Sequence, residues 1–328
     1  MALLIVNPNP VFDRTITLDA LVPGAVMRTL GVEVTAGGKG INVARVLRAL
    51  GRRAPLLIPV GTEDRERYLR LLDAEGADAR IVDVPGSVRT ASIYLERTSP
   101  RVTVVNDAGD TCAPQTWNRV VEATAELLVP GDIVLVMGSL PPGLPDEALA
   151  PIIERVHLAG ARVLIDTAPA WLAGALAAGP DIVTPNLDEA LAVLGGTPAH
   201  TMDAAGHEDI EDRACRAAVD LRARGAVRAI VTAGVHGVAM SGHEGTSWTP
   251  ALRVEAVSTV GAGDSFVAGL ADIWQHGNSD DDIDWKAAVR FGIATSAASC
   301  EQVRAGGIDP QRVTSLLERS TVASGGAR

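Results

Sequence analysis

Short apolar runs alternate with amphipathic segments along most of the chain after residue 112, and this alternation limits the possible folds more than any other feature. The apolar runs cover residues 133–137, 162–166, 182–184 and 229–232. Between them, apolar residues recur with helical spacing at 117–128, 147–158, 187–194 and 214–224. Parallel strands need long crossover connections, and the helices in those connections cover the faces of the sheet. The pattern therefore predicts βαβ units, that is, a mostly parallel α/β sheet between two helical layers.

Two regions interrupt this order with the alternation that is typical of half-exposed strands. In residues 12–36, threonines and charged residues are interleaved with isoleucine, leucine and valine. Residues 87–108 contain two such runs around a Thr-Ser-Pro turn, which predicts a hairpin. We expect the two regions to form a small β-sheet lid on a core built from residues 1–11, 37–86 and 109–320. Lid strands with an apolar outer face often pair between chains, which predicts a homodimer through the lid.

Composition and charge narrow the range of partners. The 328 residues carry a formal net charge of −11, so the chain lacks the basic excess that general nucleic-acid binding requires. No apolar run approaches the ~18 residues of a membrane span, so we expect no membrane partner. Three widely spaced cysteines, Cys112, Cys215 and Cys300, form no metal-binding motif and favour a reducing, cytoplasmic location.

The segment 258–266 carries the strongest chemical signal. Gly261, Ala262 and Gly263 precede a predicted helix, where small residues let backbone N–H groups converge and the helix dipole attracts an anion. Such a nest suits the spread charge of a transferring phosphoryl group. Asp264 lies beside it, and its position fits equally a general base for an attacking hydroxyl or an N-cap of the helix. The dipole is expected to lower the pKa of Asp264 and keep the carboxylate ionised.

A second glycine cluster precedes the helix predicted at 41–50. Gly37, Gly38 and Gly40 flank Lys39, which is one of only two lysines in the chain. The cluster is not a Walker A loop, because Gly40 stands where that motif needs Ser or Thr, and it lacks the third glycine of a dinucleotide fingerprint. Glycines let a ligand approach the backbone closely, so Lys39 can bind a phosphate and Asn42 can bond hydroxyl groups. A loop with a solvated lysine is the plainer alternative.

Two further junctions between predicted elements carry polar residues or glycines. Within 184–189, acidic side chains can cap the following helix or hold Mg²⁺ through water molecules. Asp166, at the end of a predicted strand, can contact the same site or bond the next turn. The segment 232–237 by itself indicates only a glycine turn.

Taken in their order along the chain, these four segments resemble the signatures of the PfkB/ribokinase family of sugar kinases. The resemblance covers nearly the whole chain. Residues 259–266 resemble the C-terminal signature, and 37–42 resemble the N-terminal glycine signature. The GGKGINVAR sequence at 37–45 and the GSLPPG turn at 138–143 resemble the subgroup that acts on phosphorylated ketohexoses. The resemblance implies a ribokinase-like three-layer α/β/α core, a small β-sheet lid, and ATP with Mg²⁺ as cofactors.

The resemblance also implies a role for each matching residue. Asp264 is expected to act as the base, with Gly261, Ala262 and Gly263 as the anion hole. Contacts with the sugar are expected from Asp13, Gly37, Gly38, Asn42, Asn106 and Ser139, and clamps for its phosphate from Lys39, Arg89 and Arg28. Contacts with the nucleotide are expected from Asn186, Glu189, Thr232, Gly234, Gly237 and Gly263, with Mg²⁺ held on Glu189 through water.

Two departures from the family pattern bear on these assignments. Thr184 stands where many relatives carry a lysine that contacts nucleotide phosphates, and Thr90-Ala91 stands where an asparagine sugar ligand is common. We expect ATP-dependent phosphorylation of a phosphorylated ketohexose, with fructose 1-phosphate converted to fructose 1,6-bisphosphate as the first choice. The alternatives are a tagatose 6-phosphate or fructose 6-phosphate kinase, a kinase of an unphosphorylated sugar or nucleoside, and a catalytically weak sugar-phosphate sensor.

Overall fold

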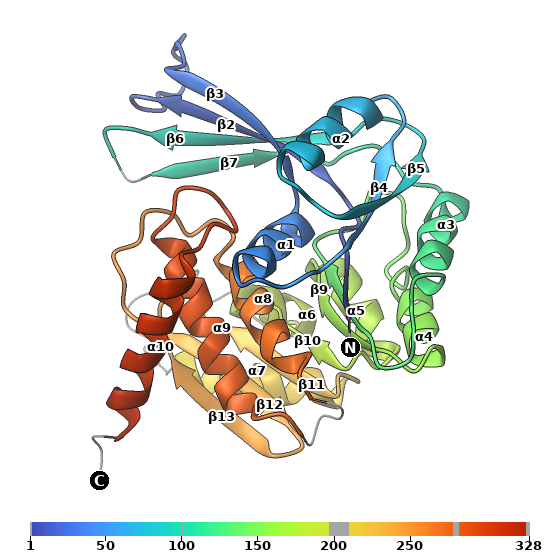
Figure 1. Ribbon diagram of the computed structural model, residues 1–328, viewed down its shortest axis with the longest axis vertical. Coiled ribbons are helices and arrows are strands. Elements are labelled where there is room, and N and C mark those ends of the chain that lie inside the picture. The colour runs from blue at the N-terminus through green and yellow to red at the C-terminus, as the bar shows by residue number, and fades with distance from the viewer. Residues whose placement is uncertain (1, 100, 197–209, 278–281, 326–328) are drawn as a thin grey trace.

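The computed structural model describes residues 2–99, 101–196, 210–277 and 282–325, which form a layered core below a small second sheet (Figure 1). The core sheet has nine strands in the order β13-β12-β11-β10-β9-β8-β1-β4-β5. Its strands are β1 Leu3–Val6, β4 Leu56–Gly61, β5 Ala79–Val84, β8 Ile133–Met137, β9 Arg162–Asp166, β10 Ile182–Val183, β11 Arg228–Thr232, β12 Gly237–Gly242 and β13 Gly245–Pro250. Seven of these strands are parallel to one another, and at one edge β12 pairs antiparallel with both β11 and β13. The predicted mostly parallel α/β fold is confirmed.

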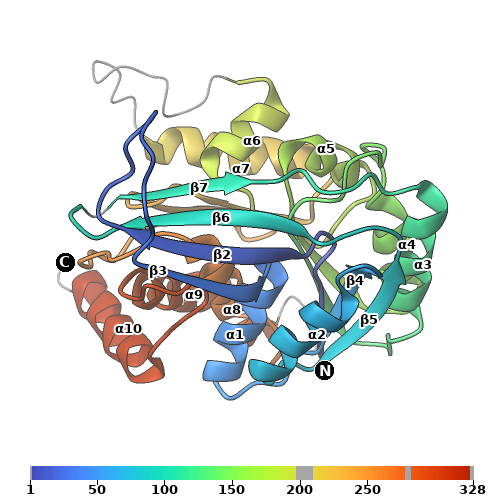
Figure 2. The same cartoon turned by 90° about the horizontal axis from the view of Figure 1, so that it is seen from above.

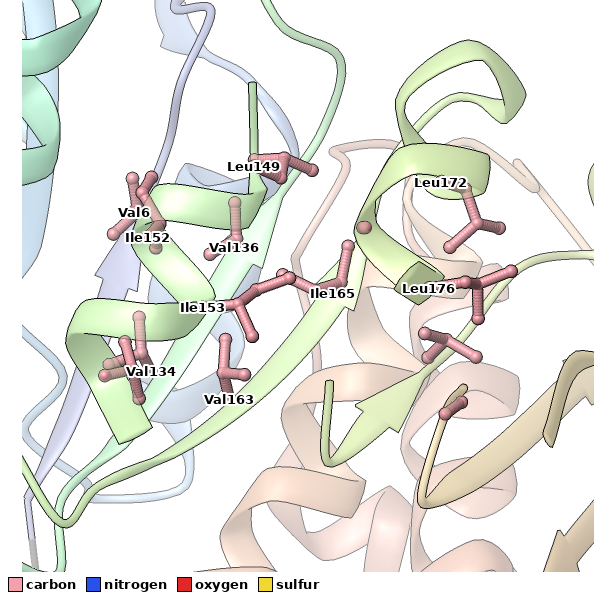
Figure 3. Packing of buried hydrophobic residues seen from close by; sticks show 14 of the residues in the cluster. Val6, Val134, Val136, Leu149, Ile152, Ile153, Val163, Ile165, Leu172 and Leu176 are labelled. Carbon is pink, nitrogen blue, oxygen red and sulfur yellow. The ribbon is translucent and has the colours of Figure 1, made fainter. Parts of the chain in front are cut away.

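Helices cover both faces of this sheet because successive side chains of a strand point to opposite sides. All five residues of β8 are buried, but Val134 and Val136 join one core cluster and Leu135 joins the other. The first cluster includes residues of α3 Pro114–Ala125, α4 Ala150–Leu158, α5 Pro169–Ala177, α6 Leu187–Leu194 and α7 Ile210–Ala223 (Figure 3). The second includes α1 Lys39–Ala49, α2 Arg65–Ala74, α8 Ala262–Trp274 and α9 Trp285–Cys300, with α10 Pro310–Gly325 packed on α9.

The second sheet has four strands in the order β3-β2-β6-β7 and lies across one end of the core (Figures 1 and 2). Its strands are β2 Val11–Leu18, β3 Gly31–Gly37, β6 Arg89–Glu96 and β7 Val102–Asn106. The outer pairs are antiparallel, as the predicted hairpin of β6 and β7 requires, whereas β2 and β6 run parallel. Both chain segments of this sheet thus leave and re-enter the core at the same place.

Several elements lack the sequence pattern that would have predicted them. Helix α5 is apolar on all sides, so it has no amphipathic period, and α2 carries arginines along its length. The hairpin of β12 and β13 is interrupted by glycines, which weaken a strand signal. Helix α8 begins at Ala262, so Ala262 and Gly263, which were expected to precede the helix, lie in its first turn. In the described part of the chain, no helix is both long and apolar enough to span a bilayer.

Helices α8 and α9 approach closely because each presents a glycine to the other. A Cβ atom built on Gly269 would lie 2.6 Å from Thr295 Oγ1 and 3.0 Å from Gly292 Cα. We predict that Gly269→Ala lowers the free energy of unfolding by about 1–2 kcal/mol, because overpacking outweighs the gain in helix propensity. Gly31→Ala is the control, because a Cβ there meets nothing within 4 Å. Urea titration of both variants measures the effect, and equal stability of the two would contradict the packing account.

Candidate active site

The ends of several parallel strands and the first turns of three helices meet at one edge of the core sheet, where ligands bind in open α/β folds. Asp166 is the last residue of β9, and Thr184 directly follows β10. Helix α1 begins at Lys39, α6 at Leu187 and α8 at Ala262. The small sheet reaches the same edge, because β3 runs directly into α1.

Asp264 lies in the first turn of α8 but does not cap it. The N-cap is Gly261, which adopts a left-handed conformation with φ 81°. The Asp264 side chain is only 6% exposed, and its Oδ2 accepts a hydrogen bond of 2.7 Å from Nδ2 of Asn42 on α1. The geometry therefore decides against the capping alternative. The bond to Asn42 takes one carboxylate oxygen and leaves Oδ1 for a ligand.

Burial changes the acidity expected for Asp264. The pKa of Asp264 is raised to about 6, because desolvation of the carboxylate outweighs the attraction of Lys39 and the hydrogen bond from Asn42. Asp166 and Asp13 add repulsion. The predicted lowering of this pKa is wrong: the helix dipole acts here on a group from which water has been removed. A carboxylate with a pKa near neutrality is a stronger proton acceptor than an exposed one.

Lys39 makes an ion pair with a residue that the sequence left undecided. Its Nζ donates to Oδ1 of Asp166 over 2.6 Å, and Thr184 Oγ1 donates to the other oxygen of Asp166 over 3.3 Å. Burial disfavours the ammonium charge, but attraction to Asp166, Asp264 and Glu189 prevails and raises the pKa of Lys39. Lys39 thus stays charged between the carboxylate of α8 and that of α6. Thr184 contributes no charge and instead supports the carboxylate that holds Lys39.

The glycines before α1 make room for polar side chains. A Cβ on Gly37 would lie 2.2 Å from Asp13 Oδ2, and one on Gly38, at φ 122°, would lie 2.6 Å from Asn7 Oδ1. Asn7 also accepts a hydrogen bond of 3.1 Å from the backbone N–H of Gly40. The cluster therefore keeps Asp13 against the start of α1. Burial is the main reason that the pKa of Asp13 is raised to about 6, although Arg45 and Arg89 act against it.

Arg89, at the start of β6, is a cation with few partners. Its Nη2 donates to the carbonyl of Asn9 over 3.2 Å and its Nη1 to that of Asp107 over 3.3 Å. Its Nε is buried and has no hydrogen-bond partner in the structure. Burial lowers the pKa of Arg89, and attraction to Asp13 is the largest effect that opposes this lowering. Such a guanidinium is prepared for an anionic ligand.

An apolar cavity of about 490 Å³ adjoins the first turn of α8. Ala262 and Gly263 form one wall, and the β11–β12 turn forms another. Gly237 is required in that turn, since a Cβ there would lie 2.5 Å from the Trp248 ring. The remaining lining comes mainly from α8, α9 and the segment after β13: Leu252, Val254, Phe266, Ile293 and Ala297 among others. Its size and apolar lining suit a flat heterocycle.

Between this cavity and Lys39 lies the start of α6. Asn186 caps α6 through its Oδ1, which accepts from the Glu189 N–H, and Glu189 Oε2 accepts from the Asn186 N–H, both over 2.9 Å. Asn186 also bridges to Thr232, and both border an open cavity of about 510 Å³ with Gly234. Burial raises the pKa of Glu189. Among the described residues no group of three or more His, Cys, Asp or Glu is placed to hold a metal. The Glu189 carboxylate is of the ligand type that Mg²⁺ accepts directly or through water.

Three of the predicted substrate residues, Arg28, Asn106 and Ser139, lie outside the hydrogen bonds described above. Arg28 is exposed in the connection between β2 and β3, Asn106 is exposed at the end of β7, and Ser139 is half-buried after β8. Their side chains make no hydrogen bond within the part of the chain that the structure describes. Asp166 is a buried polar residue that the sequence left undecided, and Arg45 is one that sequence reasoning missed. The signal available for both was position: one ends a core strand, and the other follows Asn42 by one helical turn.

The Asp264 carboxylate and the N-terminus of α8 thus lie beside an apolar cavity, at the edge of an α/β sheet with a second sheet over it. Residues 7–312 match the model of the pfkB family carbohydrate kinases, and the chain belongs to this family.

Curated relatives cover almost the whole chain. The 1-phosphofructokinase of Rhodobacter capsulatus is 33% identical over 97% of this chain and 96% of its own length. The 1-phosphofructokinase of Haemophilus influenzae is 31% identical over 95% of each chain. Among solved structures, phosphofructokinase-2 from Escherichia coli in complex with potassium superposes with a TM-score of 0.86 at 24% identity, over 98% of this chain and 99% of that one. The fold prediction and the family resemblance are both confirmed.

Proposed function

We propose that this chain is an ATP-dependent kinase that phosphorylates the 6-hydroxyl of fructose 1-phosphate and forms fructose 1,6-bisphosphate. The observation that carries the proposal is the buried Asp264 carboxylate, with one free oxygen, at the N-terminus of α8 beside a cavity of nucleotide size. The full-length relatives named 1-phosphofructokinase support the choice of substrate.

Asp264 receives the proton of the attacking hydroxyl in this proposal. As the new oxygen–phosphorus bond forms, the bond from phosphorus to the departing ADP oxygen breaks. The anion hole is assigned to the backbone N–H groups of Gly261, Ala262 and Gly263 at the start of α8, of which that of Ala262 also donates to the carbonyl of Thr259 over 3.3 Å. ATP supplies the phosphoryl group, and Mg²⁺ neutralises charge on its phosphates. Catalysis by the chain is then mainly positioning and electrostatic stabilisation.

The nucleotide is assigned to the two cavities that flank the start of α8. The apolar cavity takes the base, with Gly234 and Gly237 in the turn that borders it, and Thr232 lines both cavities. Asn186 and Glu189 face the phosphates, and Glu189 holds Mg²⁺ through water. Lys39 lies within the influence of Asp264 and Glu189, so we assign to it part of the charge that relatives supply at the position of Thr184.

The sugar phosphate is assigned to the space between the small sheet and α1. Asp13, Asn42 and the backbone of Gly37 and Gly38 bind its hydroxyls, with Asn106 and Ser139 at the border. Arg89 and Arg28 bind its phosphate. The buried, unpartnered Nε of Arg89 supports an anionic substrate over a free sugar or nucleoside, because a neutral ligand would leave that cation uncompensated.

A homodimer through the outer face of the small sheet is part of the proposal. Asp13, Thr35 and Val102 line one cavity and therefore share the inner face. Side chains alternate along strands, so Val32 and Val105 lie on the outer face, where they are 46% and 54% exposed. The free thiols of Cys112, Cys215 and Cys300 fit a cytoplasmic location.

An assay of ADP release tests the reaction and its substrate. We expect turnover with fructose 1-phosphate to exceed turnover with fructose 6-phosphate, tagatose 6-phosphate and free fructose. Asp264→Asn should lower kcat by about 10²- to 10⁴-fold, because the proton acceptor is lost, while ATP still binds. Isothermal titration with ATP is the control for folding. Activity confined to a free sugar, or near-normal kcat of the variant, would contradict the proposal.

The acidity of Asp264 predicts the pH dependence. Only the ionised carboxylate accepts a proton, so kcat/KM should rise with pH, with the midpoint of the acid limb near pH 6, and then level off. Asp13→Asn should move this limb to lower pH, because it removes a nearby negative charge that raises the pKa of Asp264. An acid limb near pH 4 in the unmodified enzyme would show that the base is an ordinary, hydrated carboxylate.

The outer face of the small sheet predicts the oligomeric state. Sedimentation equilibrium should give a dimer, and Val32→Asp with Val105→Asp should give a monomer, because a charge buried at an interface without a partner is costly. Leu158→Asp is the control, because Leu158 is 81% exposed on α4, which belongs to the large α/β unit and not to the small sheet. A monomeric unmodified chain, or a double variant that stays dimeric, would contradict this interface.

A further inference from the structure

Arg45 is a buried cation one helical turn beyond Asn42 on α1 and has no assigned role. It is 7% exposed. Its Nη1 donates to Oδ1 of Asn42 over 2.7 Å, and its Nη2 donates to the carbonyl of Ala36 over 2.5 Å. Its Nε and Nη2 also bind the two oxygens of Glu75 over 2.7 and 2.8 Å. The guanidinium is therefore held on several sides and has little freedom to turn.

The chemistry of these groups permits only one orientation of the Asn42 amide. A guanidinium can only donate hydrogen bonds, and an ionised carboxylate can only accept them. Asn42 has Arg45 on one side and Asp264 on the other, at 2.7 Å each. Its oxygen must face Arg45, and its NH₂ group must face Asp264. A flipped amide would set an oxygen against the carboxylate and an NH₂ group against the cation.

We propose that Arg45 is a positioning residue for phosphoryl transfer, which orients the Asn42 amide so that it holds Oδ2 of Asp264 and leaves Oδ1 aimed at the substrate hydroxyl. This inference rests on the proposed function of Asp264 as the base. Arg45 itself touches neither the base nor the reacting atoms. It acts on the geometry of Asp264 through Asn42.

Residues from distant parts of the chain hold Arg45 in place. Glu75 follows α2 and is 8% exposed at its side chain, and it also binds Arg304 over 2.7 Å. The carbonyl of Ala305 accepts a further bond of 3.3 Å from Arg45 Nη1. Arg45 therefore links α1 to β3, to the end of α2 and to the segment between α9 and α10. The buried ion pair of Arg45 with Glu75 therefore fixes how these segments are arranged more than it adds to the free energy of unfolding.

A kinetic double-mutant cycle of Arg45 and Asn42 tests the inference. Arg45→Met and Asn42→Ala should each lower kcat by about 10- to 100-fold, because the base is misplaced. The double variant should be no slower than Asn42→Ala alone, because Arg45 acts only through Asn42. If Arg45→Met costs as much in the Asn42→Ala background as in the unmodified enzyme, or costs nothing in either, the inference is overturned.

Two further variants separate positioning from folding. Arg45→Met leaves Glu75 paired with Arg304 alone. The double variant Arg45→Met with Glu75→Met therefore removes both charges of the buried pair and fills their space with apolar side chains. It should fold and still show the loss in kcat. Arg52→Met is the control, since Arg52 lies three residues beyond the end of α1 and pairs with the buried Asp272 over 2.5 Å, away from the site. It should lower stability without changing kcat, and an equal loss of kcat would overturn the inference.

The pH profile supplies a readout that a structural role would not change. Asp264 is faced by Lys39 and Asn42 from α1, by Asp166 from the end of β9 and by Asp13 from β2. Among these groups, Arg45→Met directly alters the Asn42 amide. It also removes the Arg45 cation, which lowers the pKa of Asp13. Loss of the oriented Asn42 donor destabilises the ionised carboxylate of Asp264, so the acid limb should move up by about one pH unit. A less ionised Asp13 repels Asp264 less and opposes only part of this shift. An unchanged limb overturns the inference. If the Asp264→Asn variant stays active, both the proposed base and the role of Arg45 are overturned. If that variant is inactive but the effects of Arg45→Met and Asn42→Ala on kcat are additive, only the role of Arg45 is overturned.

Discussion

The burial of one carboxylate, Asp264, is the constraint on which the arrangement of the site depends. A carboxylate removed from water without partners would cost several kcal/mol, so the surrounding fold has to supply them. Here α1 packs against α8 and brings Asn42 within 2.7 Å, and the same helix begins with Lys39. Attraction and hydrogen bonding do not fully replace the lost water, and this deficit is why the pKa of Asp264 stands at about 6. A group that is poorly solvated as an anion gains most when it accepts a proton.

Elements with a clear period could be predicted from the sequence, and tertiary contacts could not. The alternation of buried runs and amphipathic segments predicted β8, β9, β11 and the helices α4, α6 and α7, because strand and helix periodicity are local properties. Helix α5 was missed because its residues are apolar on the exposed side as well as on the buried one, so the helix has no polar face. The position of Asp264 followed from its motif, but its acidity did not: the helix dipole is a local effect, whereas burial depends on the packing of α1, which lies more than 200 residues away in the chain.

The glycine cluster shows the same division between local and distant causes. Its composition indicates close approach, and the structure identifies what approaches: the carboxylate of Asp13 against Gly37 and the amide of Asn7 against Gly38. Neither partner is recognisable from spacing, because one lies on β2 and the other directly follows β1. Lys39 is a similar case. The scarcity of lysine indicates a specific role, but the ion pair with Asp166 places its charge toward Glu189 and the start of α8, rather than with Arg89 on the small sheet.

Three cations at the site differ in how their charge is compensated, and this difference bears on the kind of substrate. Lys39 pairs with Asp166, and Arg45 pairs with Glu75 through two hydrogen bonds. Arg89 pairs with no carboxylate among the described residues and binds only backbone carbonyls. The two compensated cations belong to α1, in the rigid core, where their task is to hold other groups. Arg89 begins a strand of the small sheet, so under the proposed function an anion bound between this sheet and the core would accept hydrogen bonds from its guanidinium. A phosphate on the sugar has both the charge and the geometry for this, and a neutral sugar has neither.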